Sequence, residues 1–257
     1  MQYEAPLRSG RRGRTPRRYR GCVLVRAIIQ FEKSEPLRFI GHLDLLRATQ
    51  RALRRSGLPV AYSQGFNPHM LVSFASPLPV GQAGSAELAD VTLRAECSEQ
   101  ECLAALKRAL PPGLPAARVR LVDDNHPKLM AMLRTASYLI GFDSELDARP
   151  ILDAAPSFMK RESIKAVRVT KSGETPCDIK PMLHELAAFP ALNALRARVS
   201  FTQAQTLKPD LLIRALMEFS KAGVGQSPAL SETPRYGVIR TGLFGERFGQ
   251  PIPLIDC

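Results

Sequence analysis

SAELADVTLRAECSEQECLAALKRALPP, residues 85–112, carries the two clearest secondary-structure signals in the chain. Its first part, Ala86–Ala95, alternates polar and apolar side chains, which is the pattern of a strand with one buried face. Ser98 then precedes Glu101 by three residues, the spacing of a capping box, and the helix that follows should end at Pro111–Pro112. We therefore predict a strand followed directly by a capped helix.

The segments on either side extend this pair to a βαββαβ order. Val23–Phe31, Met70–Phe74 and Ala117–Val122 are short and apolar, with several β-branched or aromatic residues, so each is predicted to be a strand. Leu43–Ser56 is predicted to be a helix, because glycine and proline follow it. The resulting order is that of the ferredoxin-like split unit.

A second series of the same kind follows. Its predicted strands are residues 136–142, 164–170, 195–202 and 236–241, and its predicted helices are residues 147–161 and 208–221. We therefore expect an α+β fold with two tandem ferredoxin-like βαββαβ halves behind a disordered basic N-terminal arm. The expected arm, first half, linker, second half and C-terminal tail are residues 1–21, 22–124, 125–134, 135–245 and 246–257.

Half of the net charge of +12 lies in the N-terminal arm, where residues 1–20 contain seven arginines and one acidic residue. This segment is too rich in glycine, proline and arginine to build a core, so disorder is expected. Such arms bind polyanions electrostatically, although a solvated extension without a function would have the same composition.

The rest of the chain has the composition of a folded protein. The whole chain is 45% hydrophobic, enough to bury a sizeable core, and it lacks the run of about 20 apolar residues that would span a membrane. No apolar segment follows the basic N-terminus as it does in a secretory signal, so we expect a cytoplasmic location and no membrane partner.

The five cysteines are scattered, which predicts reduced thiols. They are Cys22, Cys97, Cys102, Cys177 and Cys257. The C-x4-C pair lacks the second pair that structural zinc needs, and no three-cysteine motif is present. We therefore expect no metal and no iron–sulfur cluster in this chain.

The predicted helix 43–56 has a basic face. Arg47, Arg51 and Arg54 recur at positions i, i+4 and i+7, with Arg55 at the margin of the same face. Like charges at this spacing repel, and a ligand with phosphates or carboxylates would relieve the repulsion. The alternative is a solvated basic face that Asp44 partly neutralises.

His42 and Asp44 lie where this helix begins. A histidine beside a carboxylate can do acid–base work, and so His42, Asp44 and His69 are the candidate catalytic residues. The alternative is structural, with Asp44 complementing the helix dipole and His42 acting as a hydrogen-bonding group near the cap.

A loop at residues 62–69 follows the helix. Gly65 and the Asn-Pro pair at 67–68 favour a turn. The loop presents Tyr62, Ser63, Gln64, Phe66, Asn67 and His69. Its aromatic faces could stack on an unpaired base, or they could pack on the core. We expect the loop to form one site with His42, Asp44 and Arg47, with Glu87 and Asp90 as acidic partners of the arginines.

Four motif elements in this region resemble a bacterial radical-SAM-associated family of domains of unknown function. They are R-F-x-x-H-L-D-x-x-R at 38–47, R-R-x-x-L-P-x-A-Y-S-x-G-F-N-P-H at 54–69, S-F-A-x-x-L-P-x-G at 73–81 and E-x-x-D at 87–90. Residues 173–180 resemble a further element around an aspartate, with Lys180 where arginine is usual. Through these elements Arg38 and Asp178 join the candidate substrate-binding residues.

The resemblance implies an accessory subunit that binds RNA or another substrate for a radical SAM enzyme in RNA modification or processing. The iron–sulfur cluster, S-adenosylmethionine and, in a cobalamin-dependent enzyme, cobalamin would belong to that partner. Two alternatives stay open. One is a stand-alone RNA-acting enzyme of endoribonuclease type, with His42 or His69 as acid or base. The other is a binder of a small acidic metabolite.

Overall fold

The computed structural model describes residues 18–19, 22–143, 148–170, 173–224 and 235–257. Residues 1–17 and 20–21 of the expected arm lie outside the described residues, so the predicted disorder stays a prediction. The described remainder of that segment is β1 (Arg18–Tyr19), which pairs with β2 (Cys22–Val23).

The first half has the predicted order of strands and helices. Its elements are β3 (Val25–Lys33), η1 (Glu35–Leu37), α1 (His42–Ser56), β4 (Val72–Phe74), β5 (Gln82–Leu93), α2 (Glu99–Ala109) and β6 (Ala116–Asp123). The capping box is confirmed, because Glu101 N donates to Ser98 Oγ at 3.1 Å and Ser98 N donates to Glu101 Oε2 at 2.8 Å.

The second half contains more elements than predicted. They are α3 (Leu129–Met132), β7 (Thr135–Phe142), α4 (Arg149–Met159), β8 (Lys165–Thr170), β9 (Gly173–Asp178), η2 (Lys180–Met182), β10 (Leu183–Phe189), η3 (Pro190–Leu192), β11 (Ala194–Ser200), α5 (Pro209–Val224), β12 (Tyr236–Arg247), β13 (Gln250–Pro253) and η5 (Leu254–Asp256). β8 pairs with β9 in a separate small sheet, and β10 is the edge strand of the main sheet.

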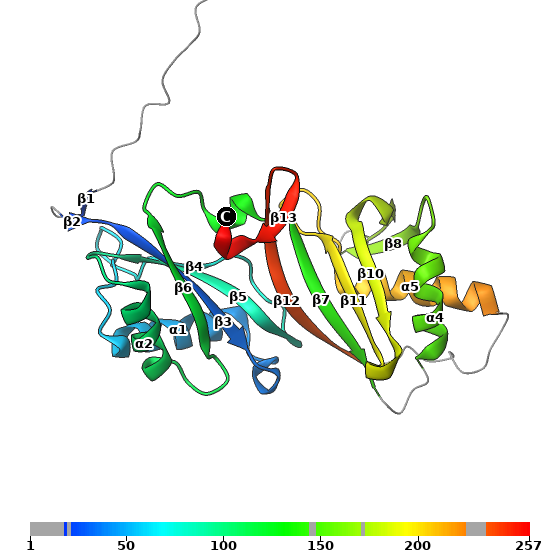
Figure 1. The fold of residues 1–257 in the computed structure, drawn as a ribbon, viewed down its shortest axis with the longest axis horizontal. Coiled ribbons are helices and arrows are strands. Elements are labelled where there is room, and N and C mark those ends of the chain that lie inside the picture. Colours follow the sequence, from blue (N-terminus) through cyan, green and yellow to red (C-terminus); the bar gives the residue numbers. More distant parts are fainter. Residues whose placement is uncertain (1–17, 20–21, 144–147, 171–172, 225–234) are drawn as a thin grey trace, which may run out of the picture.

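One mixed sheet of nine strands runs through both halves, with the order β10-β11-β7-β12-β5-β3-β6 and with β4 and β13 pairing β5 and β12 (Figure 1). All of its neighbouring strands are antiparallel except β12 and β5. Residues 238–240 of β12 lie parallel to residues 82–84 of β5, and this short pairing joins the two halves.

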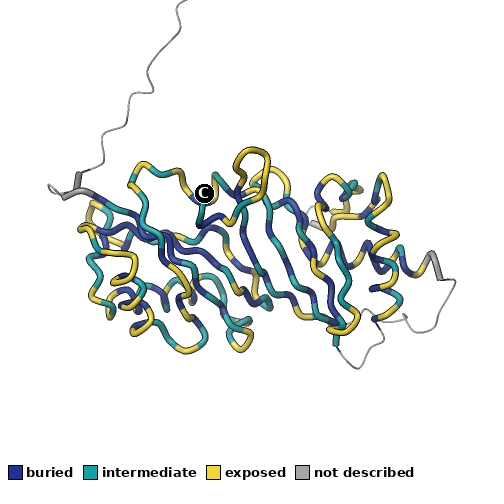
Figure 2. The backbone as a smooth tube through the Cα atoms, viewed as in Figure 1, coloured by how far each residue is buried: buried dark blue, intermediate teal, exposed yellow. Residues whose placement is uncertain are grey.

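Two apolar cores form on this sheet. In the first half, alternate residues of β3 and β5 such as Ile29 and Val91 pack with Leu53 of α1 and Leu106 of α2. In the second half, β7 packs against α4 and α5, with Ile140 fully buried in that core. Buried and half-buried residues alternate along β7, as expected for strands with unequal faces (Figure 2).

The segments expected to be a linker and a C-terminal tail both contribute buried residues. The expected linker contains α3, with Leu129 and Leu133 buried. The expected C-terminal tail returns along β12 as β13 and buries Leu254 and Ile255. The sequence did not predict the strand β13, because QPIP contains two prolines and the strand pairs with β12 alone among the described strands.

No helix among the described residues is both long enough and apolar enough to cross a membrane.

Candidate functional site

The exposed arginines of α1 are the first part of the candidate site. The helix follows Gly41 and ends at Gly57, whose positive φ of 74° closes its last turn. Leu45, Thr49, Ala52 and Leu53 are its buried residues. The arginines lie on the solvent side, all of them exposed, as the periodicity predicted; they are Arg47, Arg51, Arg54 and Arg55.

Only part of this arginine charge is compensated. Arg47 Nη1 lies 3.2 Å from Asp44 Oδ1, but both side chains are about two-thirds exposed, at 65% and 66%, so the pair is weak. Arg55 Nη2 donates to the carbonyl oxygen of Ala109 at 2.7 Å. Within the described ranges, Arg51 and Arg54 make no side-chain hydrogen bond and no ion pair. These two cations are available to a ligand.

The loop from Tyr62 to His69 closes on itself. Ser63 N donates to the His69 carbonyl oxygen at 2.8 Å, and Ser63 Oγ lies 2.8 Å from His69 Nδ1. The two aromatic rings of the loop differ in their surroundings, and stacking on a base stays a prediction. Tyr62 packs against the first-half core, whereas the Phe66 side chain is fully exposed. Gln64 and Asn67 are exposed beside it.

The loop lies at one end of α1, and His42 and Asp44 lie at the other. Just before the loop, Ala61 N donates to the carbonyl oxygen of Thr92, which is near the C-terminal end of β5. The last turn of α1 lies at this same end of the sheet. α1 begins at the opposite end, beside Lys33, and its 15 residues make it about 22 Å long. The loop and the last turn of α1 therefore lie at the same end of the first-half sheet, and the loop is not beside His42, contrary to the single site that we expected.

His42 sits in a packed environment. Its ring meets the Phe74 ring edge-on at a centroid distance of 5.6 Å, and its Nδ1 is buried without a hydrogen-bond partner among the described residues. Arg38, upstream, pairs with Glu35 and stacks on Phe39 with 4.3 Å between Cζ and the ring centroid. Neither residue contacts the α1 arginines through any described bond.

Glu87 and Asp90 do not pair with the α1 arginines, which corrects that expectation. Glu87 Oε1 accepts a hydrogen bond from Arg240 Nε at 2.8 Å, and Asp90 Oδ1 accepts one from Arg26 Nε at 3.0 Å. All four side chains are buried. Both are long-range pairs across the sheet, and buried ion pairs need such partners because an uncompensated buried charge is costly.

Asp178 has a local structural role. It accepts hydrogen bonds from Ile164 N at 2.9 Å and from Lys180 N at 3.0 Å. These bonds, together with one from Ser163, lower the pKa of its carboxyl group to about 2. Lys165 adds a weak interaction at 3.9 Å. The residue fastens the small β8–β9 sheet, and it belongs to the half of the molecule that lacks α1.

Cys97 and Cys102 form a disulfide, so the expectation of reduced thiols is wrong for this pair. The bond joins the segment before α2 to the first turn of that helix, and Cys102 is fully buried. Cys177 and Cys257 are free.

A cavity of about 550 Å³ lies where the two halves join. The sequence did not predict it. Its lining combines residues of both halves: Gly81, Gln82, Tyr138, Phe201, Lys208 and Arg240 are among them. Burial raises the pKa of the Tyr138 hydroxyl. Lys33 is close enough to Glu87 and Arg240 to interact with their charges. Burial lowers the pKa of the Lys33 ammonium group; the Glu87 carboxylate opposes this shift, and the Arg240 guanidinium group adds to it.

This cavity is tied to the motif region by backbone contacts. Gly81 N donates to the Arg38 carbonyl oxygen at 2.9 Å, and Lys33 Nζ donates to the carbonyl oxygens of Arg38 and Ile40 at 3.0 and 3.1 Å. The residues before His42 therefore help to hold the wall of the cavity. No periodic pattern could reveal this, since Arg240 lies 153 residues from Glu87.

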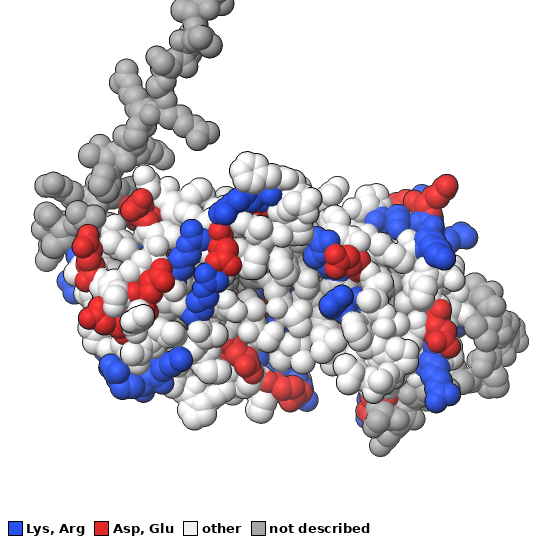
Figure 3. Space-filling model, in the orientation of Figure 1, with Lys and Arg blue, Asp and Glu red and all other residues white. Residues whose placement is uncertain are grey.

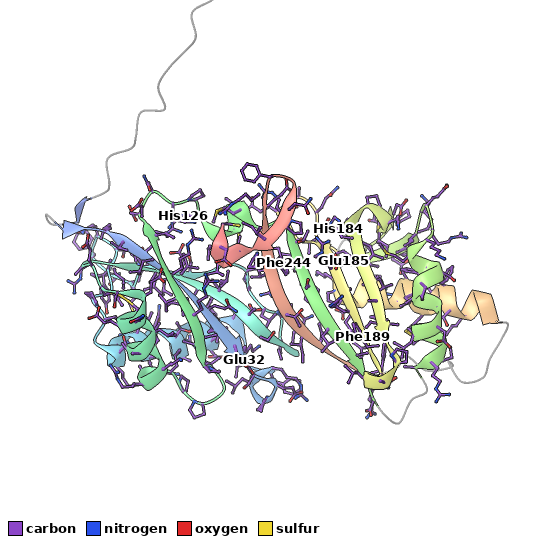
Figure 4. All side chains as sticks on the ribbon, viewed as in Figure 1. Glu32, His126, His184, Glu185, Phe189 and Phe244 are labelled. Carbon is purple, nitrogen blue, oxygen red and sulfur yellow. A yellow bond between two sulfur atoms is a disulfide. The ribbon has the colours of Figure 1, made fainter. Side chains whose placement is uncertain are left out.

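Charges on the sheet face shown in Figure 3 are interspersed, with acidic side chains beside basic ones. On β10, His184 and Glu185 lie side by side in Figure 4; Glu185 accepts from Arg198 at 2.6 Å and His184 lies 2.9 Å from Ser200 Oγ. Burial, reinforced by Arg198, lowers the pKa of His184. These groups already have partners, so this face is a weaker candidate for binding anions than α1.

The chain was also compared with known proteins. A family model described as "Uncharacterized protein conserved in bacteria (DUF2344)" matches residues 26–209, from β3 to the first residue of α5. A comparison with curated proteins found no match. Because the family match covers 184 of the 257 residues, the chain belongs to the DUF2344 family of uncharacterized bacterial proteins.

Proposed function

We propose that this protein is an accessory subunit that binds RNA, or a similarly anionic substrate, for a radical SAM enzyme. The observation that carries the proposal is the pair of exposed, uncompensated cations Arg51 and Arg54 at the end of α1 nearest the Phe66 loop. Cations that follow the backbone, together with an exposed aromatic ring on which a base can stack, are the two parts of a single-strand binding surface.

The architecture is compatible with such a role. We infer that each half is a ferredoxin-like unit, and the strand order supports this. The first half has the order β4-β5-β3-β6 and the second has β10-β11-β7-β12. Counted along the chain among the main-sheet strands of each half, with β8 and β9 left out, the first strand lies between the third and the fourth in both. The α1 surface would then be the helical layer of the first unit.

The partner part of the proposal rests on the motif resemblance at residues 38–47, 54–69, 73–81 and 87–90. The iron–sulfur cluster, S-adenosylmethionine and, in a cobalamin-dependent enzyme, cobalamin would be bound by the partner protein. The chain described here would hold the substrate. Binding is the better-supported role because neither His42, whose ring packs against Phe74, nor His69, whose Nδ1 lies 2.8 Å from Ser63 Oγ, forms an ion pair with a carboxylate among the described residues.

RNA affinity measured as a function of salt tests the binding role. Fluorescence anisotropy with a labelled single-stranded RNA should show log Kd changing linearly with log salt concentration. The double variant Arg51→Ala/Arg54→Ala should bind more weakly, and its slope should be smaller by about 1.4 because each phosphate contact to a single strand contributes about 0.7.

A charge-matched control is Lys165→Ala/Arg196→Ala, which removes two exposed cations from β8 and β11. It should retain the wild-type slope. Equal losses in both double variants would mean that the contribution is net charge alone, and an affinity independent of salt would contradict the proposal.

A further inference from the structure

The cavity at the junction has a buried floor and an exposed rim. Tyr138 and Arg240 on the floor are 3% and 1% exposed, whereas Lys208 and Asp210 on the rim are exposed. Phe201 and Tyr236 also line it. A volume of about 550 Å³ with aromatic walls and a few polar groups is typical of a small-molecule site.

Arg240 has one donor nitrogen on this floor, Nη1, without a hydrogen bond of normal geometry to a described residue. Glu87 accepts from Nε and Nη2, and the Ser76 carbonyl oxygen accepts from Nη2 at 3.0 Å. Nη1 is buried and has no hydrogen bond of normal geometry to a described residue, and the Tyr138 hydroxyl provides the guanidinium group with a side-chain hydrogen bond only outside that geometry. A buried unsatisfied donor is costly, so an acceptor that enters the cavity would be stabilised there.

The charge balance indicates which acceptor fits. Glu87 already compensates the charge of Arg240, so the remaining N–H suits a neutral acceptor, such as a carbonyl oxygen or ring nitrogen of a heterocycle. Phe201 lies with its ring centroid 5.5 Å from Arg240 Cζ, which places an aromatic face beside this donor. A planar heterocycle can stack there and accept the hydrogen bond.

The rim suits a phosphate. Lys208 directly precedes α5, a helix of 16 residues, and its ammonium group is exposed at the mouth of the cavity. The Asp210 carboxylate lies there too, and Tyr236 donates its hydroxyl to it at 2.9 Å. An adjoining hollow of about 420 Å³ shares Lys208 with the cavity and adds Arg168 and Arg214. Cations therefore outnumber the carboxylate along this path.

We propose that the junction cavity binds a nucleotide, with the base on the floor at Arg240 and the phosphate at Lys208 on the rim. This inference deepens the proposed function and rests on it for the source of the nucleotide. A free nucleoside monophosphate and the terminal nucleotide of an RNA strand share this chemistry, and the experiment separates them.

Isothermal titration calorimetry of the full chain with each of AMP, CMP, GMP and UMP tests the site. At least one should bind, and Lys208→Ala and Phe201→Leu should each weaken binding by roughly tenfold. Lys165→Ala, which removes an exposed lysine on β8, should bind like the wild type. Circular dichroism checks that Phe201→Leu is folded. Because Lys208 is exposed, Lys208→Ala should fold normally, and it tests the site even if Phe201→Leu does not fold.

A 5′-phosphorylated RNA pentanucleotide provides the second arm. If Lys208→Ala weakens both ligands, an RNA end is the occupant; if it weakens only the monophosphates, a free nucleotide is. Either result supports the site. No binding of any monophosphate by the wild type, or binding that ignores both cavity variants, overturns it. RNA affinity that depends on Arg51 and Arg54 would survive that failure, so the two proposals fail separately.

Discussion

Glu87 of β5 and Arg240 of β12 form a bidentate ion pair in the interior, with Nε–Oε1 and Nη2–Oε2 distances of 2.8 and 2.5 Å. The pair lies beside the parallel strand contact that joins the two halves, where Arg240 is in register with Gly84. The same guanidinium group lines the junction cavity. One ion pair therefore links the junction of the fold to the cavity there.

Removing one partner of this pair should be strongly destabilising. Glu87→Ala should lower the free energy of unfolding by about 3–5 kcal/mol, because it leaves the Arg240 charge buried and uncompensated. The double variant Glu87→Leu/Arg240→Met should recover most of that loss, since both charges are gone. Urea denaturation followed by circular dichroism measures both.

The exposed pair Asp44–Arg47 provides the control. Asp44→Ala should cost less than about 1 kcal/mol, as exposed ion pairs do. If Glu87→Ala lowered the free energy of unfolding by no more than Asp44→Ala does, the buried pair would not hold the junction together.

The cap of α2 makes a second, smaller contribution. Ser98→Ala removes the side-chain acceptor for Glu101 N and should lower the free energy of unfolding by about 1 kcal/mol. Gln100→Ala, at an exposed position in the same turn, should change it by less than about 0.5 kcal/mol. Equal effects of the two substitutions in a denaturation series would contradict the assignment of the cap.

Asp178 should make stability depend on pH in the acid range. Its pKa in the folded state is about 2, below the ordinary value of 3.8, so the unfolded chain binds a proton first as pH falls. The stabilisation is present above pH 3.8 and is lost as pH falls towards 2.

The variant Asp178→Asn should lack this contribution. Its melting temperature should be lower than that of the wild type at neutral pH, and the difference should shrink towards pH 2. A constant difference between pH 5 and pH 2, measured by thermal denaturation, would rule out the ionised carboxylate as the cause.

Phe66 should contribute to RNA affinity without contributing to stability. Its ring is fully exposed, so Phe66→Ala should leave the melting temperature nearly unchanged and weaken RNA binding by about 1–3 kcal/mol, the range for base stacking. Phe248, 98% exposed at the β12–β13 turn, is the matched control, and Phe248→Ala should bind RNA like the wild type. If Phe66→Ala and Phe248→Ala bound RNA with the same affinity, Phe66 would not be part of the RNA-binding site.

Local patterns in the sequence predicted the elements that local interactions determine. The strand and capped helix in residues 85–112 and the apolar stripe of α1 lie close to where they were expected, because caps and periodicity act within a few residues. β10, LHELAAF, was missed, since its alanines and charged residue do not favour a strand and its place depends on pairing with β11.

The partners of the buried charges could not be predicted. Glu87 and Asp90 were assigned to the nearby arginines of α1, but their partners come from β12 and β3. The alternation of side chains along β5 predicts that Glu87 and Asp90 point to opposite faces of the sheet. It does not predict which distant strand supplies the partner of each side chain. The cavity at the junction was missed for the same reason, because it exists only once β12 lies beside β5.

Ultraviolet crosslinking of the wild-type protein to a single-stranded RNA, followed by mass-spectrometric mapping, tests the binding role most directly. RNA that follows the second half of α1 should crosslink to the segment with Tyr62 and Phe66, and Arg51→Ala/Arg54→Ala should reduce that crosslink. Crosslinks confined to the open sheet face around His184 and Phe189, unchanged in the double variant, would contradict the account.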